Sequence, residues 1–166
     1  MGYKLIVSIA LSSILLGCAP ARLTVSSSPV ADLKTIALYP NRGLLGDAIG
    51  LELVKYGFDV FDTAQVSSMM IRLNLTEIEI LEPRNIRKLK EEGIDGLLQV
   101  RTVSGYDRHP QSISVKVISS DTGKIIIGAT WQNGFGGASG SIADRVVRSD
   151  VTDAAEDIAK GIYRHD

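Results

Sequence analysis

The residue types that most often carry catalysis or bind metal ions are scarce in this chain. It contains one cysteine, Cys18, and two histidines, His109 and His165. A zinc site needs several Cys or His ligands at short spacing, and none of these three residues has such a neighbour. A Gly-x-Ser-x-Gly motif, which would expose a nucleophilic serine on a sharp turn, is also absent from the sequence. The sequence therefore predicts no metal site, and solvent-exposed positions for both histidines.

The tripeptide Asp121-Thr122-Gly123 is the one that aspartic proteases carry at their catalytic carboxylate. In a homodimer, two such Asp residues would share a proton. Lys124 follows, however, where those proteases have a small residue, and the tripeptide lies between two predicted strands. An exposed turn gives a carboxyl no reason to have a raised pKa. We therefore interpret the tripeptide as a hairpin turn, for which Asp and Gly are suited.

The segment Gly134–Gly140 (GFGGASG) has the glycine content of a phosphate-binding loop. A Walker A motif needs Gly-Lys-Ser/Thr before a helix, but the nearest basic residue that follows is Arg145. The dinucleotide-binding pattern fails as well, because Ser139 stands in the place of its third glycine. The sequence thus predicts a flexible loop, with no cofactor and no catalytic residue.

Cys18 ends an N-terminal segment with a pattern of its own. Lys4 supplies a short basic region, and Leu5–Leu16 is an apolar run of 12 residues. A bilayer-spanning helix needs about 20 apolar residues, whereas this shorter run is typical of a signal-peptide core. The run ends in Leu15-Leu16-Gly17-Cys18, which resembles the lipobox of bacterial lipoprotein precursors. The resemblance implies a signal peptide over residues 1–17 and a Cys18 thiol that takes a diacylglycerol.

The charge balance leaves this lipid as the expected contact with a membrane. Lys4 is the only charged residue in residues 1–17, so the rest of the chain has 17 of the 18 basic residues against 19 acidic ones. This unclustered balance lacks the basic footprint of nucleic-acid binding and the polybasic patch that anionic lipid attracts. Two or three acyl chains on Cys18 would anchor the protein durably. Since Ala19 follows Cys18, where lipoproteins retained at the inner membrane commonly carry Asp, we expect the periplasmic face of the outer membrane.

After Cys18 the pattern indicates a tether and one domain. Residues 18–32 are expected to form a flexible tether, because Ala19–Ala31 is rich in Ser, Ala and Pro. Residues 33–166 show no second linker and form a single domain. Strands are expected at Leu33–Tyr39, Phe58–Phe61, Gly96–Ser104, Ser112–Ile118 and Lys124–Gln132, with a weak strand signal at Leu75–Leu81. Helices are expected at Leu44–Tyr56, Thr63–Leu73, Pro83–Glu92 and from Ser141 onward. The predicted fold is α/β (α+β), a mixed sheet of about five strands with helices packed on it, in the order β-α-β-α-β-β-β-α.

The last predicted helix has the clearest periodicity. Ser141 and Asp144 resemble a capping box at its start, with Asp in place of Glu or Gln. Its apolar residues form one stripe at steps of three and four, expected to pack on the sheet: Ala143, Val147, Val151, Ala154, Ile158 and Ile162. Its charged residues are expected to face solvent: Arg145, Arg148, Asp153, Glu156, Asp157 and Lys160.

Three stretches together resemble the periplasmic α/β domain of the curli-secretion lipoprotein CsgG and its relatives, which include lipoprotein activators of penicillin-binding proteins. Lys34–Pro40 (KTIALYP) is similar to that family's opening strand, and Asp59–Asp62 to its next, short strand. Gly93–Tyr106 (GIDGLLQVRTVSGY) resembles the strand that leaves through Gly-Tyr. Val115–Ile126 (VKVISSDTGKII) resembles the family's Thr-Gly hairpin, with Ser119 and Lys124 in place of Asp and Glu.

Pore-forming members of that family insert two transmembrane hairpins, for which this chain has too few residues. The corresponding places hold only Asp107–Gln111 and Gly134–Gly140. Each membrane-crossing strand needs about 9–11 residues, so we expect no pore. The resemblance implies a binding or assembly role outside the cytoplasm and supplies no catalytic residues.

These features predict a non-enzymatic, outer-membrane-anchored periplasmic lipoprotein that acts as a binding or assembly accessory of a secretion, surface-structure or envelope machine. An envelope protein partner is expected, and self-association is left open. One alternative is a regulator of a peptidoglycan synthase. Another is a small periplasmic hydrolase, which would need Asp107, His109 and Asp121 to converge in one pocket.

Overall fold

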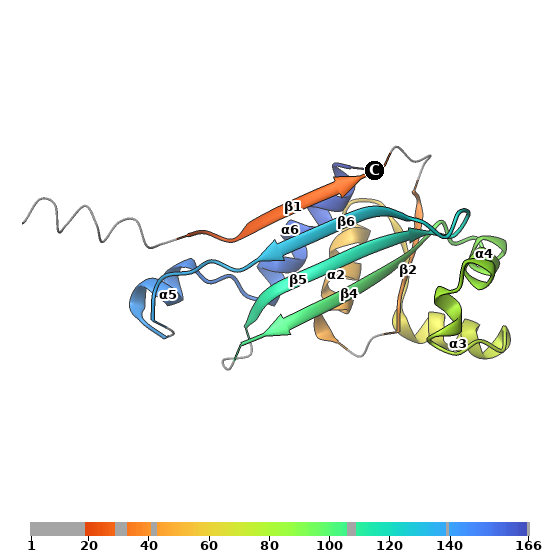
Figure 1. Cartoon of the computed structure of the whole chain (residues 1–166), viewed down its shortest axis with the longest axis horizontal. Helices are drawn as coiled ribbons and strands as arrows, with labels where there is room; N and C mark the ends of the chain where they lie inside the picture. The colour runs from red at the N-terminus through yellow and green to blue at the C-terminus, as the bar shows by residue number, and fades with distance from the viewer. Residues whose placement is uncertain (1–18, 29–32, 41–42, 106–108, 139, 166) are drawn as a thin grey trace, which may run out of the picture.

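The structure is a computed structural model that describes residues 19–28, 33–40, 43–105, 109–138 and 140–165 (Figure 1). Six strands form one sheet in the order β1-β6-β5-β4-β2-β3. They are β1 (Arg22–Ser27), β2 (Thr35–Leu38), β3 (Asp59–Phe61), β4 (Gly96–Ser104), β5 (Pro110–Ser119) and β6 (Ile125–Gln132). The helices are α2 (Leu44–Lys55), α3 (Thr63–Arg72), α4 (Pro83–Glu91), α5 (Ile142–Val147) and α6 (Val151–Tyr163), with a short 3-10 helix, η2 (Glu79–Leu81). β2 pairs in parallel with β3 and β4, and the other pairs are antiparallel, so the predicted mixed sheet with packed helices is confirmed.

The β2–α2–β3 unit forms as local sequence predicts. Ile36 and Leu38 point into the core from β2, and Ile49 meets them from α2. The helix ends at Lys55, and Gly57, which follows the cap residue Tyr56, has a φ of 94°, the left-handed conformation that glycine adopts at low cost. The connection between the parallel strands β2 and β3 is therefore the helix α2, and Gly57 allows the chain to leave this helix and enter β3.

The antiparallel strands β4, β5 and β6 form a meander. Along β5, Ile113, Val115 and Val117 are buried while Ser112, Ser114 and Lys116 are not, which confirms the predicted alternation. Asp121-Thr122-Gly123 forms the turn between β5 and β6, with Gly123 at φ 71° and its N–H donating to the Ser119 carbonyl oxygen at 2.8 Å. The tripeptide is thus the predicted hairpin turn.

Helices cover the two faces of the sheet unequally. α2 and α6 pack on one face along most of its width, and their buried apolar residues join those of β2, β4, β5 and β6 in the main core. On the other face α3, η2 and α4 cover one end of the sheet, around Ala37 and Leu97, with Phe61 of β3 and Ile118 of β5 packed at the margin. The remainder of that face, on β1, β6, β5 and the end of β4, carries no helix (Figure 1).

The prediction of a flexible tether over Ala19–Ala31 is wrong for its middle, because Arg22–Ser27 forms the edge strand β1. All six residues pair with β6. Leu23 and Val25 face α6, and a Cβ on Gly161 of that helix would lie 2.6 Å from Leu23 Cδ2. The glycine lets the helix approach the strand closely, and this packing stabilises β1.

Two further predictions are wrong. The weak strand signal at Leu75–Leu81 belongs to turns and η2, in which Ile80 is buried among helices. The last helix is broken into α5 and α6, because Asp150 starts a new helix by accepting hydrogen bonds from the Thr152 and Asp153 amides. Of the predicted stripe, Ala154, Ile158 and Ile162 are fully buried, whereas Ala143 is exposed and Val147 only half-buried.

Candidate functional site

His109 and Asp121, two of the residues considered for acid–base chemistry, lie at opposite ends of β5. His109 precedes β5 and Asp121 follows it, so the ten residues of the strand separate them, which corresponds to about 30 Å. His165 is exposed beyond the end of α6. Asp107 and Cys18 lie outside the described residues. The hydrolase arrangement therefore lacks the convergence of His109 and Asp121 that it needs.

The described part of the chain offers neither a metal site nor a membrane-spanning helix. It contains no group of three or more His, Cys, Asp or Glu placed to hold a metal ion. None of its helices combines the length and the apolar character that crossing a membrane requires.

Two hollows on the described surface lie beside α3. A cleft of about 620 Å³ lies beside α3, lined in part by Asp62, Gln65, Arg72 and Glu92. Asp62 and Gln65 cap that helix reciprocally, and Arg72 pairs with Glu92. A second hollow of about 360 Å³ runs between α2 and α3. The charged groups of the first hollow make structural contacts, and the second is lined mainly by apolar residues.

The uncovered part of the sheet is a flat polar surface with a regular plan. Strand register places twelve residues in three rows of four, with partners side by side on one face. We call these twelve the open face: Arg22, Gln132, Ser112 and Val103 in the first row, Thr24, Thr130, Ser114 and Arg101 in the second, and Ser26, Gly128, Lys116 and Gln99 in the third. Strand spacing and rise give it sides of roughly 14 Å. None of the twelve residues is buried.

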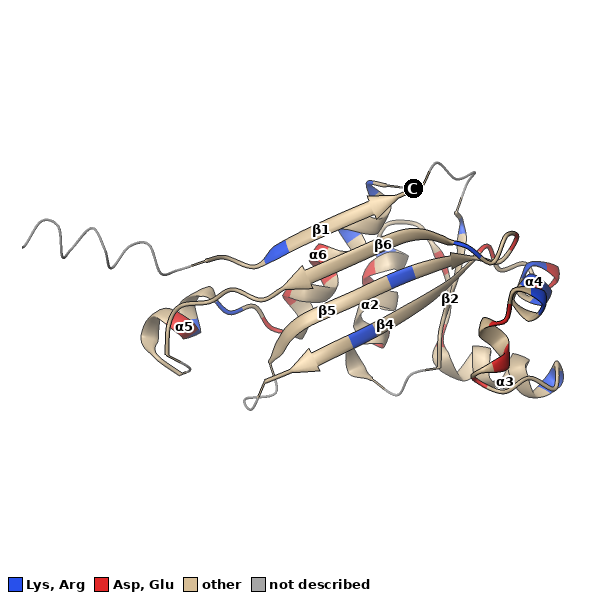
Figure 2. Cartoon of the chain, viewed as in Figure 1, with Lys and Arg blue, Asp and Glu red and all other residues tan. Residues whose placement is uncertain are grey.

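The charges of the open face all have one sign. Arg22, Arg101 and Lys116 are its charged residues, and no carboxylate occurs among the twelve positions. Figure 2 shows these basic segments on β1, β4 and β5 with no acidic residue on the same strands. At the border of the open face, the Tyr39 hydroxyl donates to the Glu77 carbonyl oxygen at 2.9 Å. Partial burial and the negative charge of Glu77 raise the pKa of Tyr39, and the positive charge of Arg101 opposes this shift. The face is thus a cationic, hydroxyl-rich surface on a chain of negative net charge.

A second unusual surface lies at the end of the sheet where the described chain begins. Ala19 N–H donates to the Phe135 carbonyl oxygen, and Phe135 N–H donates to the Ala19 carbonyl oxygen, both at 2.8 Å. This pairing brings the residue that follows Cys18 to the loop between β6 and α5. α5 projects beyond the sheet at this end (Figure 1).

The loop after β6 is packed, and the prediction of a flexible loop over Gly134–Gly140 is wrong for its first residues. A Cβ on Gly134 would overlap the Val147 carbonyl oxygen, and one on Gly136 would overlap that of Ala143. Two glycines therefore allow the backbone of the loop to lie against the backbone of α5. Their role is close packing, not phosphate binding.

The glycine loop and α5 together are called the α5 unit, and Asn133 connects this unit to the sheet. Its amide nitrogen donates to the carbonyl oxygens of Pro110 at 2.7 Å and Ser149 at 3.0 Å. Its amide oxygen accepts from the N–H of Gly134 at 2.8 Å and of Ser149 at 2.9 Å. One side chain thus links β5, the glycine loop and the α5–α6 junction.

An ion pair inside the unit removes two charges from the surface. The Asp144 carboxylate accepts from Arg148 Nε at 3.0 Å and from Gly140 N–H at 2.9 Å, and its side chain is 2% exposed. The Gly140 amide and the Arg148 guanidinium lower the pKa of Asp144 against the opposing effect of desolvation. Ser141 caps α5 as predicted, but Asp144 completes no capping box, and Arg148 is half-buried instead of facing solvent.

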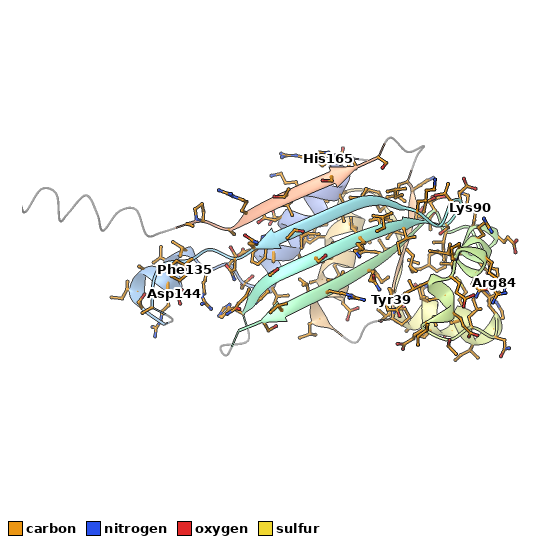
Figure 3. The ribbon with its side chains drawn as sticks, viewed as in Figure 1. Tyr39, Arg84, Lys90, Phe135, Asp144 and His165 are labelled. Atoms are coloured by element: carbon orange, nitrogen blue, oxygen red, sulfur yellow. The ribbon has the colours of Figure 1, made fainter. Side chains whose placement is uncertain are left out.

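The outer side of the unit is apolar and uncovered. The side chains of Phe135, Ile142 and Val146 are 58%, 84% and 79% exposed, and Ala143 is exposed beside them. We call these four residues the tip; Figure 3 shows Phe135 and Asp144 at this end. Sequence reasoning missed the tip because the spacing of Ala143 and Val147 suggested burial, and it missed the open face because that surface depends on strand register.

No known family matches this chain, and no curated protein sequence matches it. Solved structures with a similar backbone arrangement include PelC from Paraburkholderia phytofirmans, which forms a dodecamer in two crystal forms. One form, of a point variant, has 14% identity, a TM-score of 0.48 and coverage of 86% of this chain and 96% of that one. The other has 14% identity, a TM-score of 0.45 and coverage of 82% and 96%. Lipoprotein GNA1162 from Neisseria meningitidis has 19% identity, a TM-score of 0.48 and coverage of 75% and 96%. At these scores the likenesses carry no inference about function, and membership of the CsgG-like family remains a prediction.

Proposed function

We propose that this protein is a non-enzymatic lipoprotein, anchored through Cys18 at the periplasmic face of the outer membrane, that binds a partner in an envelope assembly machine through its open face. The observation that carries the binding role is the uniform charge of that face. Three cations lie among hydroxyl and amide side chains on about 14 Å by 14 Å of flat sheet, with no carboxylate among the twelve positions.

The chemistry of the open face indicates what the partner presents. Arg101 and Lys116 lie diagonally on adjacent strands, within reach of one carboxylate-bearing segment. Arg22 lies at the opposite edge, so a partner that neutralises all three cations must spread over four strands. A surface of one sign steers complementary charges toward it and rejects like charges. We therefore expect an acidic protein surface as the partner.

Anchoring is tested first. Cys18→Ser removes the only thiol of the chain, so the variant should carry no acyl chains and remain an unprocessed precursor. Intact-protein mass spectrometry measures both properties. A wild-type mature protein without acyl chains would contradict the anchoring part of the proposal.

Partner binding is tested by photo-crosslinking in cells. A photoreactive residue at Ser114, in the middle row of the open face, should give adducts, and one at Thr152, exposed on α6, should not. The double variant Arg101→Glu/Lys116→Glu should abolish the Ser114 adduct, whereas Lys160→Glu, also exposed on α6, should leave it unchanged. Equal adducts at both sites, or an adduct indifferent to charge reversal, would refute binding at this face.

The identity of the adduct also separates two roles. An outer-membrane export or assembly protein supports the accessory role. A peptidoglycan synthase would instead assign the protein to regulation of cell-wall synthesis and overturn the assembly part of the proposal.

A further inference from the structure

We infer that the tip, formed by Phe135, Ile142, Ala143 and Val146, lies in the surface of the lipid bilayer beside the acyl chains carried by Cys18. The inference rests on the proposed anchoring and adds a second, protein-made contact with the membrane. It gives the domain a defined orientation on the membrane in place of a position at the end of a loose tether.

The position of the tip follows from the pairing of Ala19. Two backbone hydrogen bonds of 2.8 Å hold Ala19 against Phe135. The acylated residue precedes Ala19 directly in the sequence, and one residue spans at most about 3.6 Å. An acyl anchor on that residue would therefore enter the bilayer on the same side of the domain as Phe135.

The chemistry of the tip suits the membrane interface. Phe135, Ile142 and Val146 are more than half exposed, and burying such apolar surface in the headgroup boundary is favourable. The Asp144 carboxylate, which anionic lipid would repel, is buried with Arg148. Arg145 is the exposed charge of α5, and a cation at this place is attracted to anionic headgroups.

The tip is also built to stay exposed. Gly134 and Gly136 bring the loop backbone onto α5, and Asn133 ties both to the sheet with four hydrogen bonds. The apolar residues therefore cannot fold back to cover one another without breaking these contacts. A rigid unit with an uncovered apolar side needs another surface to cover it, and the bilayer is the surface that the anchor brings nearest.

The experiment uses the full, lipidated chain in vesicles of phosphatidylethanolamine and phosphatidylglycerol with brominated acyl chains, which quench tryptophan on contact. Trp131, the only native tryptophan, is fully buried and serves as the unquenched reference. Phe135→Trp should lose most of the added emission. The matched control is Ile125→Trp, which is similarly exposed at 51% but lies at the other end of β6, roughly 25 Å away. It should keep its emission.

A second variant tests the tip as a surface. Adding Ile142→Glu and Val146→Glu to Phe135→Trp should restore the emission while the acyl chains remain. An acylated Phe135→Trp protein that stays unquenched overturns the inference and leaves the anchoring intact. A protein without acyl chains shows instead that the anchoring itself fails. Crosslinks between copies through residue 135, with no quenching, would assign the tip to self-association and also overturn the inference.

Discussion

α5 and α6 follow each other in the chain and carry apolar residues at the same helical spacing, yet one exposes them and the other buries them. Ile158 and Ile162 of α6 are fully buried against the sheet, whereas Ile142 and Val146 of α5 are among the most exposed apolar residues described. The chain between the helices turns at Ser149, where Asn133 binds the backbone, and Asp150 starts the second helix. Helical spacing thus shows that a helix has an apolar side, but the anchoring of its ends decides what covers that side.

The largest effect is expected from Ile158→Ala in α6. The change removes three carbons from a fully buried site, and large-to-small substitutions of this kind cost about 2–5 kcal/mol. A domain of this size has a free energy of unfolding of only about 5–15 kcal/mol. Thermal melts should show a large fall in Tm. The control is Glu156→Ala on the solvent side of the same helix, and equal Tm values for the two variants would contradict the packing of α6.

Asn133→Ala should have the next largest effect, because it releases the α5 unit from the sheet. The substitution leaves the backbone groups of Ser149 and Gly134 and the Pro110 carbonyl oxygen without their partner. Unsatisfied polar groups at partly buried sites cost about 1–3 kcal/mol. Hydrogen exchange should also speed up in α5 more than in α6. Gln132→Ala, at the exposed neighbouring position, is the control and should change neither property.

A smaller effect, dependent on pH, is expected from Asp144→Asn. The Gly140 amide and Arg148 lower the pKa of Asp144 in the folded protein. A carboxyl with a lowered folded-state pKa contributes stability above its unfolded pKa, and this contribution is lost as the pH falls through the folded value. The difference in Tm between wild type and variant should therefore be largest at neutral pH and shrink below about pH 4. A constant difference across this range would show that charge at Asp144 is not what stabilises α5.

Arg148→Gln sharpens the same test. If Asp144 and Arg148 act as a pair, the double variant should cost less stability than the sum of the two single variants. Additive losses would assign the Asp144 effect to its hydrogen bond with the Gly140 amide instead.

Local chemistry predicted more of this molecule than long-range pairing did. The turn at Asp121-Thr122-Gly123 and the helix stop at Gly57 need only neighbouring residues, and both are confirmed. β1 was missed because only Leu23 and Val25 mark its inner side and its partner β6 lies far along the chain. The break at Ser149 was missed because acidic residues such as Asp150 and Asp153 also occur on the solvent side of a continuous helix.

The two surfaces at the centre of the proposals differ in how far the sequence could reveal them. The open face exists only through the register of four strands. One of them is β1, which the sequence analysis had assigned to a flexible tether, and β1 joins the face by pairing with β6. The tip depends on the close approach of Gly134 and Gly136 to α5, which glycine content alone presents as flexibility. In both cases the sequence shows the residue types, but the contacts that bring these residues together follow only from the structure.

Ile142→Ala should have the smallest effect on stability, and it is the direct counterpart of Ile158→Ala. The same three carbons are removed, but from a side chain that is 84% exposed. Surface substitutions of this kind change the free energy of unfolding by less than about 0.5 kcal/mol, and alanine has the higher helix propensity. In detergent-free buffer, melts of residues 19–166, produced without the signal segment and without the anchor, should therefore coincide with and without Ile142→Ala. On vesicles, the acylated chain should instead lose stability when Ile142 is replaced. Binding to a surface that interacts only with the folded state raises the stability of that state, so loss of Ile142 should lower the Tm there. A clear fall in Tm without lipid, growing with protein concentration, would show that another copy already covers α5 in solution, and the contrast between the two helices would then reflect two different protein contacts.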